Sequence, residues 1–105
     1  MILFQFHTDN IKVQIDAYFQ DGKLIVDGYD IGKTVEEFWG DSDYEYTTTV
    51  FPLDVKKLYP LFNISEDPDI LLQQLAARFN TNSCYSDFRN FCDANGIQYE
   101  SFSWT

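Results

Sequence analysis

At 105 residues the chain is long enough to bury one hydrophobic core and too short for two, so we predict a single domain over residues 1–105. Hydrophobic residues make up 45% of the chain and aromatic residues 18%, a composition that excludes intrinsic disorder. The formal net charge of −10 repels nucleic acid and anionic lipid, so we expect neither nucleic acid nor a membrane as a direct partner.

The amino-terminal third has the alternation of a β-meander. Residues 2–7 are apolar and aromatic and precede the turn-forming triplet at 8–10, which predicts a first strand and a turn. Residues 11–20 alternate apolar and polar side chains, as a strand with one buried face does. Asp21-Gly22 tolerates the positive φ angles of a two-residue hairpin turn, so a third strand is predicted from residue 23 to about residue 29.

The next segment predicts a loop, a short helical turn and a fourth strand. Residues 30–34 have loop composition, and Thr34 with Glu37 offers a capping box for one helical turn over residues 35–39. Residues 44–50 are β-branched and aromatic, which favours a fourth strand.

A helical period then replaces the alternation. Asp54 is the expected N-cap of a first helix, which Pro60 should kink or shorten. Its apolar positions recur at helical spacing: Val55, Leu58, Leu61 and Phe62.

Two further helices and a closing strand complete the predicted elements. Asp67 can cap a second helix whose first position is Pro68, and this helix continues to about Phe79. A third helix is expected from Ser83 until Gly96 ends it. Its buried positions should be Tyr85, Phe88, Phe91 and Cys92. The tail, residues 97–104, alternates like a strand. The order of elements predicts an α+β fold: an antiparallel sheet, formed by a meander of about four strands plus a C-terminal strand, with two or three helices on one face.

The most unusual composition lies between Glu36 and Tyr46, where carboxylates and large aromatic side chains alternate. From Asp27 to Tyr46 there are seven acidic residues and one basic residue, a net charge of −6. Carboxylates attract a cationic protein and aromatic side chains provide desolvated anchors, so the segment predicts a protein-binding surface. The candidate partner-binding residues are Glu36, Glu37, Trp39, Asp41, Asp43, Tyr44, Glu45 and Tyr46. A structural interpretation stays open, in which Tyr44 and Tyr46 simply pack on the sheet.

The residues suggest no catalytic machinery. His7 lies at the end of the first predicted strand without a placed nucleophile, and we interpret it as a packed or strand-end residue. Cys84 and Cys92 lie in one predicted helix, too far apart for a disulfide, and are expected to be buried structural residues. An enzyme would need His7 or Cys84 beside a carboxylate. We therefore predict no enzymatic activity, no catalytic residues and no cofactor.

The acids at 41, 43 and 45 match only the opening of a calcium loop. The required glycine is replaced by Tyr46 and the closing glutamate by Pro52, so we predict no metal site. The amino terminus lacks a basic n-region, and Asp9 interrupts its apolar run, which favours a cytoplasmic location over secretion.

The run VEEFWGDSDYEY from Val35 to Tyr46, followed by a strand and a Leu-rich helix, resembles small bacterial immunity proteins encoded beside polymorphic toxins, including those of contact-dependent growth inhibition systems. The resemblance extends over residues 24–62. It implies a cytoplasmic protein that binds and neutralises one cognate toxin domain, and the acidic charge points to a basic toxin such as a nuclease. It does not indicate an oligomeric state. The alternative is a small intracellular protein- or ligand-binding module without a toxin partner.

Overall fold

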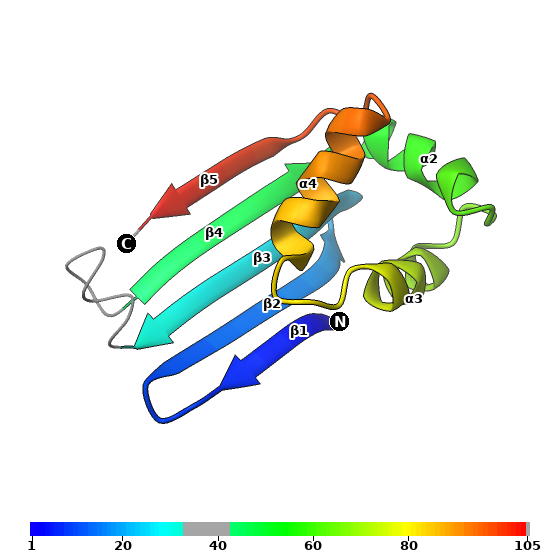
Figure 1. Cartoon of the computed structure of the whole chain (residues 1–105). Coiled ribbons are helices and arrows are strands. Elements are labelled where there is room, and N and C mark those ends of the chain that lie inside the picture. Colours follow the sequence, from blue (N-terminus) through cyan, green and yellow to red (C-terminus); the bar gives the residue numbers. More distant parts are fainter. Residues whose placement is uncertain (33–42, 105) are drawn as a thin grey trace.

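The computed structural model describes residues 1–32 and 43–104. Five strands form one antiparallel sheet in the order β1-β2-β3-β4-β5, and three helices pack on one face of it (Figure 1). The strands are β1 (Ile2–His7), β2 (Ile11–Gln20), β3 (Lys23–Gly32), β4 (Asp43–Val50) and β5 (Glu100–Trp104), and the helices are α2 (Pro52–Leu61), α3 (Pro68–Arg78) and α4 (Cys84–Ala94). The predicted α+β fold is confirmed. The helical turn predicted over residues 35–39 lies outside the described residues.

The β2–β3 hairpin follows the predicted turn. Asp21 and Gly22 have φ angles of 53° and 78°, the positive values that a two-residue hairpin turn of this type requires. β3 extends three residues beyond the predicted end, because its pairing with β2 continues until Gly32 lies opposite Ile11. The long hairpin therefore forms the centre of the sheet.

The start of α2 differs from the prediction. The helix begins at Pro52 with Phe51 as its N-cap, because proline's fixed φ angle suits the first helical position. Asp54 is therefore in the first turn and does not cap the helix. Its carboxylate accepts a hydrogen bond of 2.6 Å from the backbone N–H of Gln98. The helix ends at Leu61, one residue after Pro60, in line with the predicted shortening.

The ends of α3 and α4 follow the capping chemistry in the sequence. The Asp67 side chain accepts from the backbone N–H groups of Asp69 and Ile70, at 3.0 and 3.3 Å. Gly96 follows α4 with a φ angle of 69°. The closing strand begins at Glu100, later than predicted, because the Ile97 N–H bonds to a carbonyl of α4.

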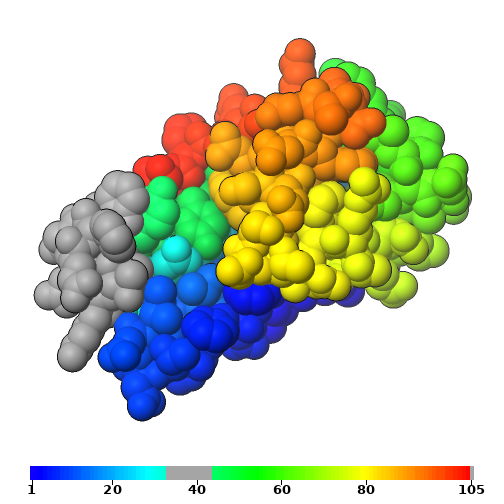
Figure 2. Space-filling view, viewed as in Figure 1, coloured from blue at the N-terminus to red at the C-terminus, as the bar shows by residue number. Residues whose placement is uncertain are grey.

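The core lies between the helices and the central strands. In Figure 2, α3 and α4 (yellow and orange) cover the middle of the helix-bearing face, and α2 (green) lies at one end. Alternation along β2, β3 and β4 turns every second side chain toward the helices. The fully buried side chains include Ile15, Leu24, Val26, Val50, Leu58, Leu71, Leu75 and Phe88. Two of the four side chains predicted to be buried in α4, Tyr85 and Phe91, are only partly buried.

Candidate functional site

Only some of the predicted partner-binding residues belong to the described part of the chain. Glu36, Glu37, Trp39 and Asp41 lie outside it. Asp43 is the first residue of β4, opposite Ile31 of β3. The remaining candidates, Tyr44, Glu45 and Tyr46, follow it along β4. Partner binding by all eight residues stays a prediction.

Strand alternation separates these three residues between the two faces of the sheet. Tyr44 and Tyr46 point to the helix-bearing face, and exposed Glu45 points to the opposite face, hereafter the open face. The tyrosines and Glu45 therefore belong to two different surfaces, and the structure does not bring them together.

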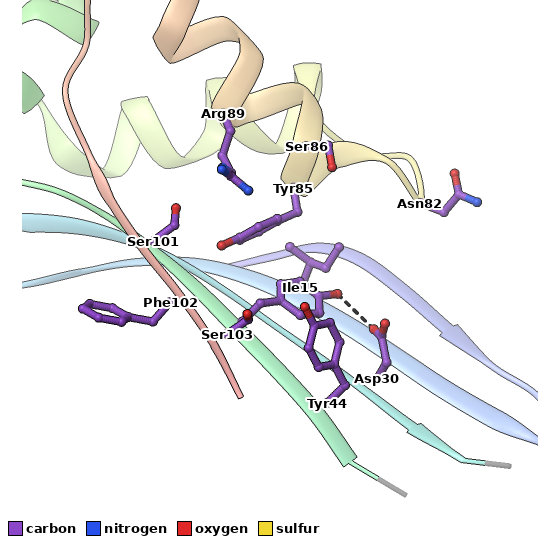
Figure 3. A pocket seen from close by; sticks show the side chains of 11 residues that line it. Ile15, Asp30, Tyr44, Asn82, Tyr85, Ser86, Arg89, Ser101, Phe102 and Ser103 are labelled. Atoms are coloured by element: carbon purple, nitrogen blue, oxygen red, sulfur yellow. Dashed lines mark hydrogen bonds between the residues drawn. The ribbon is translucent and has the colours of Figure 1, made fainter. Parts of the chain in front are cut away.

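The helix-bearing face has a groove of about 500 Å³ between α4 and the strands β4 and β5. Tyr44 and Tyr46 of β4 and Tyr85 of α4 line it, and the nearly fully buried Ile15 belongs to its floor. The rings of Tyr46 and Tyr85 meet edge to face with centroids 4.6 Å apart. Figure 3 shows Tyr85 and Arg89 pointing from α4 toward the strands. A volume of this size can hold a small molecule.

Two charged side chains line this groove among the described residues. Asp30 of β3 accepts a hydrogen bond of 2.9 Å from the Tyr46 hydroxyl (Figure 3). Burial raises the pKa of Asp30, although this hydrogen bond opposes the shift. Burial, followed by the nearby Asp30 carboxylate, raises the pKa of Tyr46 well above its ordinary value. The other charged group is Arg89, whose guanidinium lies 5.9 Å from the centre of the Tyr85 ring.

A hydroxyl network around the buried Thr48 holds α4 against the sheet beside the groove. Thr48 is fully buried, and its hydroxyl donates to the Tyr85 hydroxyl at 2.7 Å. The Ser101 hydroxyl of β5 lies 2.7 Å from the same Thr48 oxygen. Because Thr48 has a single hydroxyl proton, Ser101 is the donor in the second bond. The network connects β4, β5 and α4 at one point and fixes the position of the Tyr85 ring.

The open face presents two exposed aromatic rings from β5. Phe102 is 64% exposed and Trp104 is 49% exposed. In the β4–β5 register, Trp104 lies opposite Glu45, and Phe102 lies opposite Thr47. Tyr44 and Tyr46 contribute nothing to this aromatic pair. An acidic side chain and an exposed aromatic ring are therefore neighbours on the open face, as Glu45 and Trp104 show. The ring comes from β5 and not from the segment predicted to bind a partner.

Asp27 of β3 organises the polar part of the open face next to these rings. Its carboxylate accepts hydrogen bonds from the hydroxyls of Thr47 and, at 2.5 Å, of Tyr18. This bond to Asp27 is the main cause that raises the pKa of Tyr18 to about 12. Asp27, Glu45 and Trp104 line a depression of about 200 Å³. The open face thus has acidic side chains beside a shallow depression that Trp104 helps to line.

The sequence reasoning missed Phe102, Trp104 and Arg89 as site residues. The alternation of residues 97–104 put Phe102 and Trp104 on one face of a strand, but it did not indicate that this strand pairs with β4. No sequence signal distinguished Arg89, because a single arginine in an amphipathic helix is most often on a solvated face.

The histidine and the cysteines match their structural interpretations. His7 is exposed at the end of β1. Cys84 and Cys92 are both buried and unpaired in α4, and burial raises their pKa values to about 11 and about 12. Neutral buried thiols are poor nucleophiles.

Neither a metal cluster nor a membrane span is found in the part of the chain that the structure describes. No three His, Cys, Asp or Glu residues there are grouped so that they could hold a metal ion. Within residues 1–32 and 43–104, no helix has the length and apolarity that crossing a bilayer requires. Comparison with known proteins returned no matching family model, curated protein or solved structure.

Proposed function

We propose that this protein is an immunity protein that binds and neutralises a basic toxin domain, and that it docks through the open face of its sheet. The docking surface would be an acidic aromatic patch on β3, β4 and β5, composed of Asp27, Glu45, Glu100, Phe102 and Trp104. The observation that carries the proposal is the exposed pair Phe102 and Trp104 in register with β4, where Trp104 faces Glu45.

The patch contains both components of a tight interface for a cationic partner. Large exposed rings gain free energy when a partner removes them from water, and aromatic side chains dominate the binding energy of many interfaces. The patch has three acids and no base, within a chain of net charge −10. Its field would attract a basic protein and raise the association rate.

The resemblance of residues 35–46 to immunity proteins supports a toxin as this partner and the cytoplasm as the place of binding. A nuclease is the favoured toxin class, because the basic groups that bind a nucleic acid backbone are also the groups that carboxylates can pair with. The predicted acids Glu36, Glu37, Asp41 and Asp43 remain candidate partner-binding residues besides the patch.

The test is a binding experiment with the toxin-like domain encoded next to this gene. The association rate should fall severalfold between about 50 and about 150 mM salt. Trp104→Ala and Phe102→Ala should each weaken binding by about tenfold or more. Leu53→Ala is the matched control, since Leu53 is a 79% exposed apolar residue of α2 outside the patch.

A charge reversal separates steering by the patch from steering by overall charge. Glu45→Lys should slow association more than Glu66→Lys, which makes the same change of net charge at an exposed residue between α2 and α3. Equal effects of these two variants, or full binding by both aromatic variants, would remove the patch from the proposal. Absence of any complex would remove the toxin partner.

A second candidate function is the binding of a small molecule in the groove under α4. A ligand-binding module is expected to have an aromatic pocket with few converging acids. The groove has three tyrosines and one carboxylate among its described lining residues, which favours this candidate. The tyrosines of the groove and the patch lie on opposite faces of the sheet, and Phe102, on the edge strand β5, also lines the groove.

A further inference from the structure

We propose that the groove under α4 binds a small aromatic carboxylate, with Arg89 receiving the carboxylate and the tyrosines packing against the ring. The inference rests on the second candidate function above and specifies its ligand. It is independent of the toxin partner.

The first support is that Arg89 has aromatic neighbours but no acidic partner among the described residues. The guanidinium lies near two rings, 5.9 Å from the Tyr85 centroid and 5.6 Å from that of Tyr99. Among the described residues, no carboxylate is within ion-pair distance of it, and its buried Nε atom has no hydrogen-bond acceptor. A partly buried cation without a counter-ion pays a desolvation cost, which an arriving anion reduces.

Two acids that line a pocket together with Arg89 are hydrogen-bonded to other groups. Asp30, across the groove, accepts from the Tyr46 hydroxyl. Asp93, one turn further along α4, accepts from the Tyr99 hydroxyl at 2.8 Å. Each of these carboxylates accepts a hydrogen bond from a tyrosine, and neither lies within ion-pair distance of Arg89. With no acidic partner among residues 1–32 and 43–104, the guanidinium is available to an anion from outside.

The second support is the wall of the groove. The ring centroids of Tyr44 and Tyr46 are 5.6 Å apart at a tilt of 42°, and the Tyr46 and Tyr85 rings meet edge to face. A planar ring can add to such a cluster by stacking or by an edge contact. Ser86, Ser101 and Ser103 also line the groove and supply neutral hydroxyls for a polar substituent.

The charge balance of the groove selects a single negative charge. Arg89 is the one base among its described lining residues, and Asp30 is the one acid. A guanidinium binds a carboxylate through parallel hydrogen bonds, so one arginine suits one carboxylate. A dianion such as a phosphate monoester would keep an excess charge next to Asp30 and in the field of a strongly acidic protein.

The test uses benzoate as the probe and benzamide as its neutral counterpart of nearly the same shape. Two-dimensional amide NMR of the full chain should show benzoate shifting resonances of β4, β5 and α4, with benzamide at least about tenfold weaker. Arg89→Gln should remove the preference for benzoate, and Arg89→Lys should restore it in part, because lysine keeps the charge without the planar fork.

Lys56→Gln provides the charge control, because it removes one positive charge from an exposed position on α2. It should leave benzoate affinity unchanged within about twofold. The acid–amide comparison on the unaltered protein needs no variant, so it decides the question even if Arg89→Gln fails to fold.

Three outcomes would overturn the inference in distinguishable ways. Equal binding of benzoate and benzamide would retain a ligand groove and reject the carboxylate. Unchanged benzoate preference in a folded Arg89→Gln protein would reject Arg89 as its receptor. Absence of shifts from both probes would reject the groove as a binding site for this ligand class, together with the second candidate function, and would leave the toxin proposal untouched.

Discussion

The ring of Tyr46 lies over Gly28, its register partner on β3. A methyl group added at position 28 would come within 2.0 Å of the Tyr46 ring. The absence of a side chain at position 28 is therefore what allows Tyr46 to lie flat on the sheet and reach Asp30, and the shape of the groove depends on it.

Gly28→Ala should displace the Tyr46 ring, because the new methyl group and the ring cannot occupy the same space. We expect a loss of about 1–3 kcal/mol in the free energy of unfolding, from the broken bond to Asp30 and the lost contact with Tyr85. Urea denaturation measures it. In a Tyr46→Ala background the same substitution should cost much less, and an equal cost there would show that the strain comes from the backbone.

Thr48→Val should destabilise the fold by about 1–3 kcal/mol although it preserves side-chain volume. The substitution leaves the hydroxyls of Tyr85 and Ser101 without the oxygen that both of them contact. Thr49→Val, at the neighbouring position on the open face, is the control and should change stability by less than about 0.5 kcal/mol. Thermal or chemical denaturation of both variants gives the comparison, and equal stabilities would contradict the network.

The pH dependence of stability should contain a contribution from Asp30. Its folded-state pKa is raised by burial, so the stability linked to this group is fully present below the unfolded-state pKa and is lost as pH rises through the folded-state pKa. Asp30→Asn, which mimics the protonated acid, should therefore be most stabilising relative to the unaltered protein near pH 7. That difference should shrink toward about pH 4. If the stability gained by Asp30→Asn grew as pH fell, the pKa of Asp30 would be lowered in the folded protein and not raised.

The two cysteines should resist alkylation in the folded protein. Since burial raises the thiol pKa values to about 11 for Cys84 and about 12 for Cys92, few thiolates exist near pH 8. Iodoacetamide should label the native chain at least about a hundredfold more slowly than the chain in urea. Mass spectrometry of the labelled protein provides the rates, and rapid modification of native Cys84 would argue for a reactive thiol.

The meander could be predicted from the sequence because its information is local. The β2 and β3 strands alternate clearly, and the turn between them has residues that tolerate positive φ angles. The cap of α3 at Asp67 is equally local. Asp54 shows the limit of such reasoning: a carboxylate near a helix start can cap it or bind elsewhere, and here it accepts a hydrogen bond from Gln98, which is 44 residues away.

The candidate site could be predicted only in part, because its residues come together through long-range pairing. Alternation indicated which side chains of β5 share a face, but the position of Trp104 beside Glu45 depends on the β4–β5 register. The location of Arg89 in the groove depends on how α4 is rotated against the sheet. Neither the β4–β5 register nor the rotation of α4 can be predicted from a local pattern of residues.

The pairing of β5 with β4 also has a consequence for the order of folding. The first three pairings join strands that are consecutive in the chain, whereas β5 must return across about 50 residues and three helices. Closing so large a loop is slow, so β5 should dock last. A chain that has formed only β1 to β4 lacks Phe102 and Trp104 on its surface. Under the proposed docking mode, the partner would thus recognise completed molecules and ignore folding intermediates.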